Sequence, residues 1–200
     1  MPVCIGGGRA LRRALFLTGV VTALACGQPA PRPMAKRAAA VHANELTLAG
    51  LRPGVDTVSR AIAKYKGPGT GKKGETQFSW EDVCRVESLF LDTDVSGRVE
   101  TIRVASHQKS TIADCDKTPR SPWRTGRGLA VHDSARRVIE LYGEPDSRSP
   151  STRDGQPLEL WYYQFDWAGA DVPQVMEVLC TKKDGQPSQV VEITLAAPSL

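Results

Sequence analysis

The first hydrophobic segment of the chain has the pattern of an export signal. An uncharged apolar stretch covers residues 14–25 and follows Arg9, Arg12 and Arg13. A membrane-spanning helix needs about 20 apolar residues, and this stretch is shorter. A basic start, a short apolar segment and small residues before a cleavage point are typical of a secretory signal peptide. We therefore expect residues 1–25 to form a signal peptide.

The next segment, residues 26–47, has no regular hydrophobic pattern. It contains three prolines, many alanines and few large apolar side chains. Such a composition buries too little surface to offset the entropy that ordering the chain costs. We interpret this segment as a flexible tether.

Two later segments carry apolar residues at helical spacing and repeat each other. Residues 55–69 align without gaps on residues 132–146. The matching pairs are Asp56 with Asp133, Arg60 with Arg137, Ile62 with Ile139, Tyr65 with Tyr142 and Pro68 with Pro145. Each copy begins with an acidic residue suited to a helix start and ends at glycine and proline, which stop a helix. The pattern predicts two short amphipathic helices.

A polar, glycine-rich loop and then strand-like sequence follow each predicted helix. The residues with strand character are 76–80, 83–91 and 98–104 after the first helix, and 158–167, 175–181 and 189–195 after the second. The predicted fold class is α+β, a tandem repeat of a helix followed by an antiparallel β-meander. Its first unit spans residues 48–105, a connecting insert spans 106–124, and the second unit spans 125–200.

The order of these short motifs resembles a known family of envelope proteins. Gly50 and Gly54 precede the first helix, Tyr142 and Pro145 end the second, and Trp80 or Trp161 opens the strands. This arrangement resembles the SmpA/OmlA (BamE-like) outer-membrane lipoproteins, and its tandem form is similar to the fold of beta-lactamase inhibitor protein. The resemblance covers roughly residues 48–104 and 125–195. It implies a protein that binds other proteins rather than a catalyst.

The end of the signal segment resembles the lipobox of bacterial lipoproteins. A small residue, Ala25, stands directly before Cys26, and the resemblance implies that Cys26 becomes linked to diacylglycerol. Ala23 and Ala25 fit an ordinary secretory cleavage site equally, so simple secretion stays open. Gly27 in place of aspartate implies the outer membrane, facing the periplasm.

Charge narrows the set of partners and leaves the export route open. Residues 1–25 hold three of the 26 basic residues and none of the 22 acidic ones, so the rest of the chain is close to neutral. Nucleic-acid binding needs a concentrated basic face, which the mixed charges do not supply, and we expect no nucleic-acid partner.

Arg12 and Arg13 fit either a twin-arginine export signal or a plain basic signal start.

Three cysteines remain after Cys26, which in an oxidising compartment suggests one disulfide and one free thiol. The disulfide candidates are Cys84 and Cys115, because the segment between them has the pattern of a hairpin that returns the chain. A pairing of Cys115 with Cys180 is the alternative, since spacing alone does not decide connectivity.

No motif in the chain fits a cofactor, a metal or a catalytic centre. The glycine-rich residues 67–73 lack the spacing of a phosphate loop. Residues 92–97 begin like a calcium-binding loop, but Arg103 occupies the position of its essential glutamate. The three histidines, at positions 42, 107 and 132, have no ligand spacing, and no serine lies in a nucleophile elbow. We expect no cofactor, no metal site and no catalytic residue.

An aromatic strand supplies the candidate binding residues. Alternation places Trp161, Tyr163, Phe165 and Trp167 on one face of residues 160–167. This row is either core beneath a helix or, in part, an anchor for a partner on an open sheet face. The candidate partner-binding residues are Trp80, Trp123, Trp161 and Tyr163.

The leading hypothesis is a lipid-anchored envelope protein that acts as a non-catalytic protein-binding or scaffold module. Its expected partners are the membrane, through the lipid anchor, and an envelope protein. A secreted inhibitor of an extracellular enzyme is the alternative. An envelope hydrolase is the third hypothesis, and it requires His107 or His132 to cluster with a serine and a carboxylate.

Overall fold

The computed structural model describes residues 44–66, 70, 74–107, 121–165 and 175–197. All of them belong to one unit, residues 38–200. The predicted signal peptide, Cys26 and most of the predicted tether lie outside the described residues. Among the described helices, none has the length and apolar character that crossing a membrane requires.

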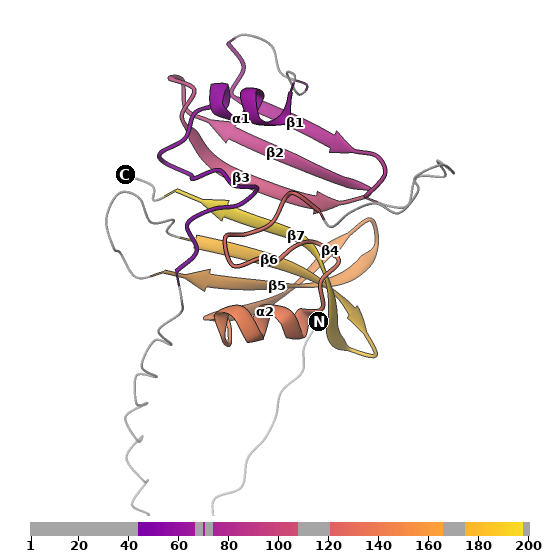
Figure 1. Cartoon of the computed structure of the whole chain (residues 1–200). Coiled ribbons are helices and arrows are strands. Elements are labelled where there is room, and N and C mark those ends of the chain that lie inside the picture. Colours follow the sequence, from indigo (N-terminus) through magenta and orange to yellow (C-terminus); the bar gives the residue numbers. More distant parts are fainter. Residues whose placement is uncertain (1–43, 67–69, 71–73, 108–120, 166–174, 198–200) are drawn as a thin grey trace, which may run out of the picture. The chain divides into compact units, whose positions relative to one another are not determined.

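The described part of the chain forms one antiparallel sheet of seven strands with two short helices (Figure 1). The strands are β1 (Gln77–Asp82), β2 (Glu87–Thr93), β3 (Val99–Ser106), β4 (Ser147–Arg153), β5 (Gln156–Gln164), β6 (Val175–Lys183) and β7 (Gln186–Ala196). The helices are α1 (Val58–Tyr65) and α2 (Ala135–Tyr142). The strands lie in the order β1-β2-β3-β7-β6-β5-β4.

The predicted tandem repeat of helix-plus-meander units, and with it the BamE-like or inhibitor-like fold, is wrong. The last strand, β7, pairs with β3 from Thr101 opposite Ala196 to Ala105 opposite Glu192, so all strands share one sheet. A separate three-stranded meander would leave unpaired backbone groups along β3. The β3–β7 pairing satisfies those groups with hydrogen bonds. Hydrophobic periodicity alone does not reveal which strands pair.

Strand β4 lies where the sequence predicted a polar loop. Its residues are almost all exposed, and Pro150 stands in its centre. An exposed edge strand buries neither face, so it lacks the alternating pattern by which strands are predicted. Asp154 and Gly155 both have positive φ, 51° and 76°, which suits the tight turn that joins β4 to β5.

Register places one row of apolar side chains across the sheet on the face that carries the helices. Leu89 pairs with Val104, Val104 with Ile193, Ile193 with Val178, and Val178 with Trp161. All five are buried, and they share one core with Ala61 of α1 and Val138 of α2. The core is therefore continuous from β2 to β5.

The opposite face of the sheet carries a mixed row. Phe90 pairs with Arg103, Arg103 with Thr194, Thr194 with Glu177, and Glu177 with Tyr162. Because side chains alternate between the faces of a strand, this row points away from the core. The helix residues that are buried pack in the core on the other side, so no described helix covers this face. We call it the helix-free face.

A buried carboxylate fixes the chain that precedes α1. Glu45 accepts hydrogen bonds from the backbone N–H groups of Leu46 at 2.9 Å, Thr47 at 3.0 Å, Gly126 at 2.9 Å and Arg127 at 3.1 Å. The hydroxyl of Tyr142, the last residue of α2, donates to it as well, at 2.6 Å. This one side chain therefore connects the start of the described chain with the loop before α2 and with α2 itself.

The shared core gives a test of the single sheet. Val104 lies in the middle of the core row and is 0% exposed, whereas Val95, in the turn after β2, is 100% exposed. We expect Val104→Ala to lower the free energy of unfolding by about 2 kcal/mol, because the cavity it leaves cannot collapse fully. The matched control Val95→Ala should change it by less than about 0.5 kcal/mol. Equal effects in urea unfolding would contradict the described core.

Candidate functional site

The four aromatic residues expected to bind a partner all lie in the core. Trp80, Trp123, Trp161 and Tyr163 are 9, 5, 2 and 0% exposed. Trp161 donates from Nε1 to Glu159 at 2.7 Å, and the Tyr163 hydroxyl donates to the Gly143 carbonyl at 3.1 Å. The structure therefore places them as core residues, and none is an open anchor for a partner.

The described cysteines have different environments. Cys84 is disulfide-bonded, and Cys180 is free and buried. Burial raises the pKa of the Cys180 thiol to about 12, so the thiol stays protonated near neutral pH. Cys115 lies outside the described residues, so its pairing with Cys84 stays a prediction. The alternative pairing with Cys180 does not occur.

The calcium-like residues form a hairpin turn. Oδ1 of Asp94 accepts hydrogen bonds from the Ser96 N–H at 2.8 Å, the Ser96 hydroxyl at 2.6 Å and the Arg98 N–H at 2.9 Å. These bonds, that of the Ser96 side chain first, lower the pKa of Asp94. Within the described ranges, no group of three or more histidine, cysteine, aspartate or glutamate side chains is placed to hold a metal.

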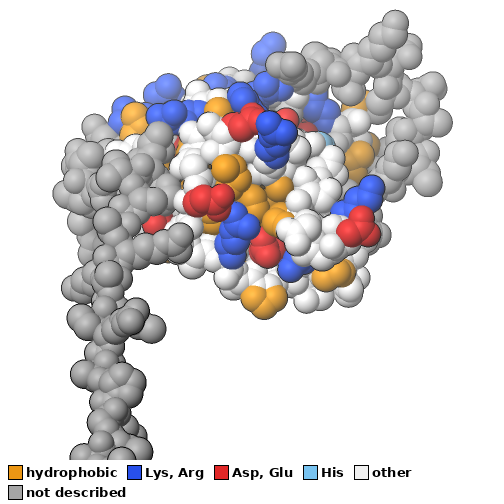
Figure 2. Space-filling view, turned by 90° about the horizontal axis from the view of Figure 1, so that it is seen from below, with side chains coloured by type: hydrophobic (Ala, Val, Ile, Leu, Met, Phe, Trp, Pro, Cys, Tyr) orange, Lys and Arg blue, Asp and Glu red, His pale blue; other side chains and the backbone are white. Residues whose placement is uncertain are grey.

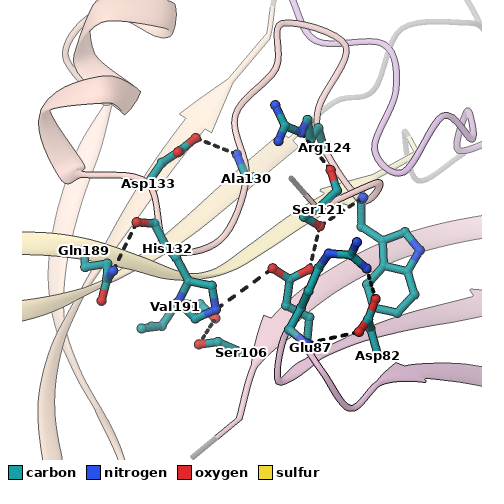
Figure 3. A network of polar contacts seen from close by, with 12 residues as sticks. Asp82, Glu87, Ser106, Ser121, Arg124, Ala130, His132, Asp133, Gln189 and Val191 are labelled. Atoms are coloured by element: carbon teal, nitrogen blue, oxygen red, sulfur yellow. Dashed lines mark hydrogen bonds and ion pairs between the residues drawn. The ribbon is translucent and has the colours of Figure 1, made fainter. Parts of the chain in front are cut away.

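A polar network connects Glu87, at the start of β2, with the chain segment that precedes α2 (Figure 3). Glu87 is buried and accepts a hydrogen bond from the Ser121 hydroxyl at 2.5 Å. Nε2 of His132 lies 4.0 Å from the other oxygen of the same carboxylate. Burial raises the pKa of Glu87, while the Ser121 hydrogen bond and the charge of His132 oppose that shift.

His132 is held in an uncommon backbone conformation. Its φ is 71°, in the left-handed region that costs energy for residues other than glycine. The His132 N–H donates to the Val190 carbonyl at 2.8 Å, and Nε2–H of the Gln189 amide donates to the His132 carbonyl at 3.1 Å. These bonds to β7 hold the His132 backbone in place, and His132 lines two surface cavities.

The larger cavity, of about 680 Å³, opens on the helix-free face. Its floor comes from β2, β3, β5 and β7, with Phe90, Ala105, Leu158 and Val191 as its apolar members. Arg153, at the end of β4, reaches across it to hydrogen-bond the Glu192 carboxylate on β7. Strands β5 and β6 lie between β4 and β7 in the sheet, so the β4–β5 turn curls over this face.

Arg103 stands in the same cavity on a fixed platform. The centre of its guanidinium lies 4.4 Å from the centroid of the Phe90 ring, a cation–π contact between paired residues of β2 and β3. Nη1 of Arg103 is 3.9 Å from Glu192, the carboxylate that Arg153 also contacts. The cavity thus combines an apolar floor with two guanidinium groups around one carboxylate.

The smaller cavity, of about 550 Å³, lies on the other side of His132. Glu87 and Ser121 line it, together with Arg85, Arg124 and Arg137. Each of these arginines already has a protein partner. Arg85 pairs with Asp82, Arg124 donates to the Ser121 carbonyl, and Arg137 pairs with Glu140. This cavity therefore offers a ligand few uncommitted charged groups.

Serine, histidine and carboxylate groups do cluster, as the hydrolase hypothesis requires, but not in a catalytic order. The Ser88 hydroxyl is hydrogen-bonded to Nε2 of His107, yet Ser88 is 1% exposed. Ser121 donates to Glu87 instead of to His132, and its oxygen accepts from the Trp123 N–H at 3.1 Å. A nucleophile must be open to substrate and hydrogen-bonded to its base. No serine in the described ranges meets both conditions with a histidine.

The cavity residues were not found by sequence motifs. In the sequence, Arg103 is notable only as the cation at the glutamate position of a calcium-like loop, and no functional motif includes Phe90, Arg153 or Glu192. One feature of the sequence hinted at the cavity. Phe90 is a large apolar residue at a position of β2 whose side chain points to the same face as Ser88 and Asp92, away from the buried Leu89 and Leu91. The pairing of Phe90 with Arg103, which makes the platform, depends on register and is invisible in a single sequence.

The raised pKa of Glu87 predicts a pH dependence of stability. A carboxyl whose pKa is higher in the folded protein than in the unfolded chain favours folding when protonated. The wild type should therefore lose stability as pH rises from the ordinary glutamate pKa through the raised one. Glu87→Gln should remove that part of the profile. Urea unfolding from about pH 4 to about pH 8 measures it. Parallel profiles for the two proteins would mean that Glu87 is not the group responsible.

The comparisons with known proteins give no relative. No family model matches the chain, and no curated protein or solved structure is significantly similar to it. The resemblance to the SmpA/OmlA lipoproteins accordingly stays a prediction from short motifs, and the functional argument rests on the site itself.

Proposed function

We propose that the protein is a non-catalytic binding protein of the bacterial cell envelope and that its ligand occupies the cavity on the helix-free face. The observation that carries this proposal is the cavity of about 680 Å³ on a sheet face that no described helix covers. Ligand sites are commonly concave, of roughly 300–1,000 Å³, with apolar walls and a few fixed polar groups.

The chemistry of the cavity supports binding. Phe90 and Leu158 offer apolar surface, while Arg103, Arg153 and Glu192 offer charged groups at its rim. Arg103 is held on the Phe90 ring and Arg153 by Glu192, so both guanidinium groups are oriented before a ligand arrives. A site that is already ordered loses less conformational entropy when it binds.

The proposed location rests on the sequence. Cys26 follows a signal-like segment and precedes a proline-rich stretch, which suits a lipid anchor and a tether that place the folded part in the periplasm, at the outer membrane. Positive and negative side chains are interspersed on the face that Figure 2 shows. Such a surface favours a protein or small-molecule partner over a nucleic acid.

Filling the cavity tests the proposed function. We expect full-length wild-type protein to bind the neutral dye Nile red, with increased fluorescence, because the cavity floor is apolar. Ala105→Trp should abolish most of that increase, since Ala105 lines the cavity and a bulky side chain there occupies its volume. Gln156→Trp, at the exposed rim, is a second blocking variant that leaves the core untouched.

The matched control for the dye experiment is Val95→Trp, which adds the same side chain at a fully exposed turn. It should bind the dye as the wild type does, and circular dichroism checks that each variant is folded. Undiminished dye binding by both blocking variants would show that this cavity is not a binding site.

The anchor is tested separately by expression in a bacterial host. Wild type should pellet with membranes and carry a lipid-sized mass increment, and Cys26→Ser should lose both, because the thioether needs the Cys26 sulfur. Intact mass and membrane fractionation measure these properties. A wild-type protein that is unmodified, not membrane-bound and cleaved after Ala25 would contradict the lipid anchor and favour simple secretion.

A further inference from the structure

Arg103 is a charged side chain outside the core that is held in place without a side-chain hydrogen bond. Its guanidinium stacks on the Phe90 ring at 4.4 Å, and its nearest carboxylate, Glu192, lies 3.9 Å away, beyond hydrogen-bond distance. No protein acceptor within the described residues takes a hydrogen bond from it. Arginine offers five N–H donors in a planar fork that matches a carboxylate.

The cavity already contains a carboxylate in contact with these cations. Arg153 hydrogen-bonds one oxygen of Glu192, and Arg103 faces the same oxygen from β3. The two guanidinium groups therefore share a single carboxylate, and the donors of Arg103 stay available on the cavity side. Arg103 is 44% exposed, so a ligand can reach it without unfolding any strand.

The remaining charges favour a ligand with a single negative charge. Asp154, in the β4–β5 turn, lines the cavity together with Glu192, so two acidic groups stand against the two arginines. His107 and His132 line it as well and contribute positive charge only when protonated. Each additional negative charge on a ligand would add repulsion from Asp154 and Glu192, whereas the repulsion of a single carboxylate can be offset by its pairing with Arg103.

We propose that this cavity binds an amphipathic monocarboxylic acid, with its carboxylate paired to the Arg103 guanidinium and its apolar stem against Leu158 and Ala105. The inference rests on the proposed function, because it names the ligand class of the same cavity. Arg103 gives the ligand its orientation, since the planar guanidinium on Phe90 donates hydrogen bonds to a carboxylate edge-on. Arg153 and Glu192 hold the wall of the cavity behind it.

Decanoate and decanol, titrated calorimetrically into the full-length protein, test the proposal. The two probes share an apolar stem and differ in the carboxylate. Wild type should bind decanoate about tenfold or more tightly than decanol, because a charge-assisted hydrogen bond adds to the apolar contact. Arg103→Gln should remove most of that preference, because the guanidinium that pairs with the carboxylate is gone while Leu158 and Ala105 still offer apolar surface, and Arg103→Lys should keep only part of it, because lysine lacks the fork.

Arg136→Gln is the matched control, since Arg136 is an exposed arginine on α2 that does not line the cavity. It should bind both probes as the wild type does. Decyl phosphate, which carries more negative charge, should bind less tightly than decanoate. Tighter binding of the phosphate would overturn the choice of a monocarboxylate.

Glu192→Gln makes the sharpest variant, because the proposal predicts a gain. The variant removes the negative charge that competes for Arg103, while the glutamine amide oxygen can still accept a hydrogen bond from Arg153 and so keep the cavity wall in place. Decanoate should therefore gain about three- to tenfold in affinity relative to decanol. If decanol binds as well as decanoate in the wild type, the ligand class is wrong and the binding cavity stands. If neither probe binds, the ligand class is also overturned, and the Nile red experiment decides separately whether the cavity binds at all.

Discussion

The pairing of β3 with β7 is the constraint on which the rest of this structure depends. It runs from Thr101 opposite Ala196 to Ala105 opposite Glu192 and joins β3, which lies in the middle of the described chain, to β7, its last strand. Without it, β3 and β7 would each be an edge with unpaired backbone groups. With it, one apolar row extends across both halves, from Leu89 to Trp161, and each half of the chain contributes to the same core.

The same pairing builds the candidate site. It sets Glu192 of β7 beside Arg103 of β3, which register has already placed opposite Phe90 of β2. The curled β4–β5 turn then brings Arg153 to the same carboxylate. A cavity with an apolar floor and oriented guanidinium groups therefore follows from strand order and register, while the helices and the buried Glu45 stabilise the opposite side.

Sequence periodicity located most elements but not their assembly. The two helices fall inside the predicted segments 55–69 and 132–146, because their apolar spacing and their glycine and proline stops are local signals. The single sheet, by contrast, depends on which edge strands meet, and the polar strand β4 has no buried face to mark it. The sequence left open whether the aromatic row is core or a partner anchor, because alternation does not say which face of a strand is covered. Phe90 and Arg103 become a site through register alone.

The most direct test of this account is to locate decanoate binding by nuclear magnetic resonance on the isotope-labelled full-length protein. The account predicts that the largest shift changes occur in β2, β3 and β7 around Phe90, Arg103 and Glu192, with the side-chain N–H signal of Arg103 among them. Residues of α1 and α2 should change little, because they pack on the other face. Changes centred on the helices, or none at saturating decanoate, would contradict the claim that the helix-free face is the binding surface.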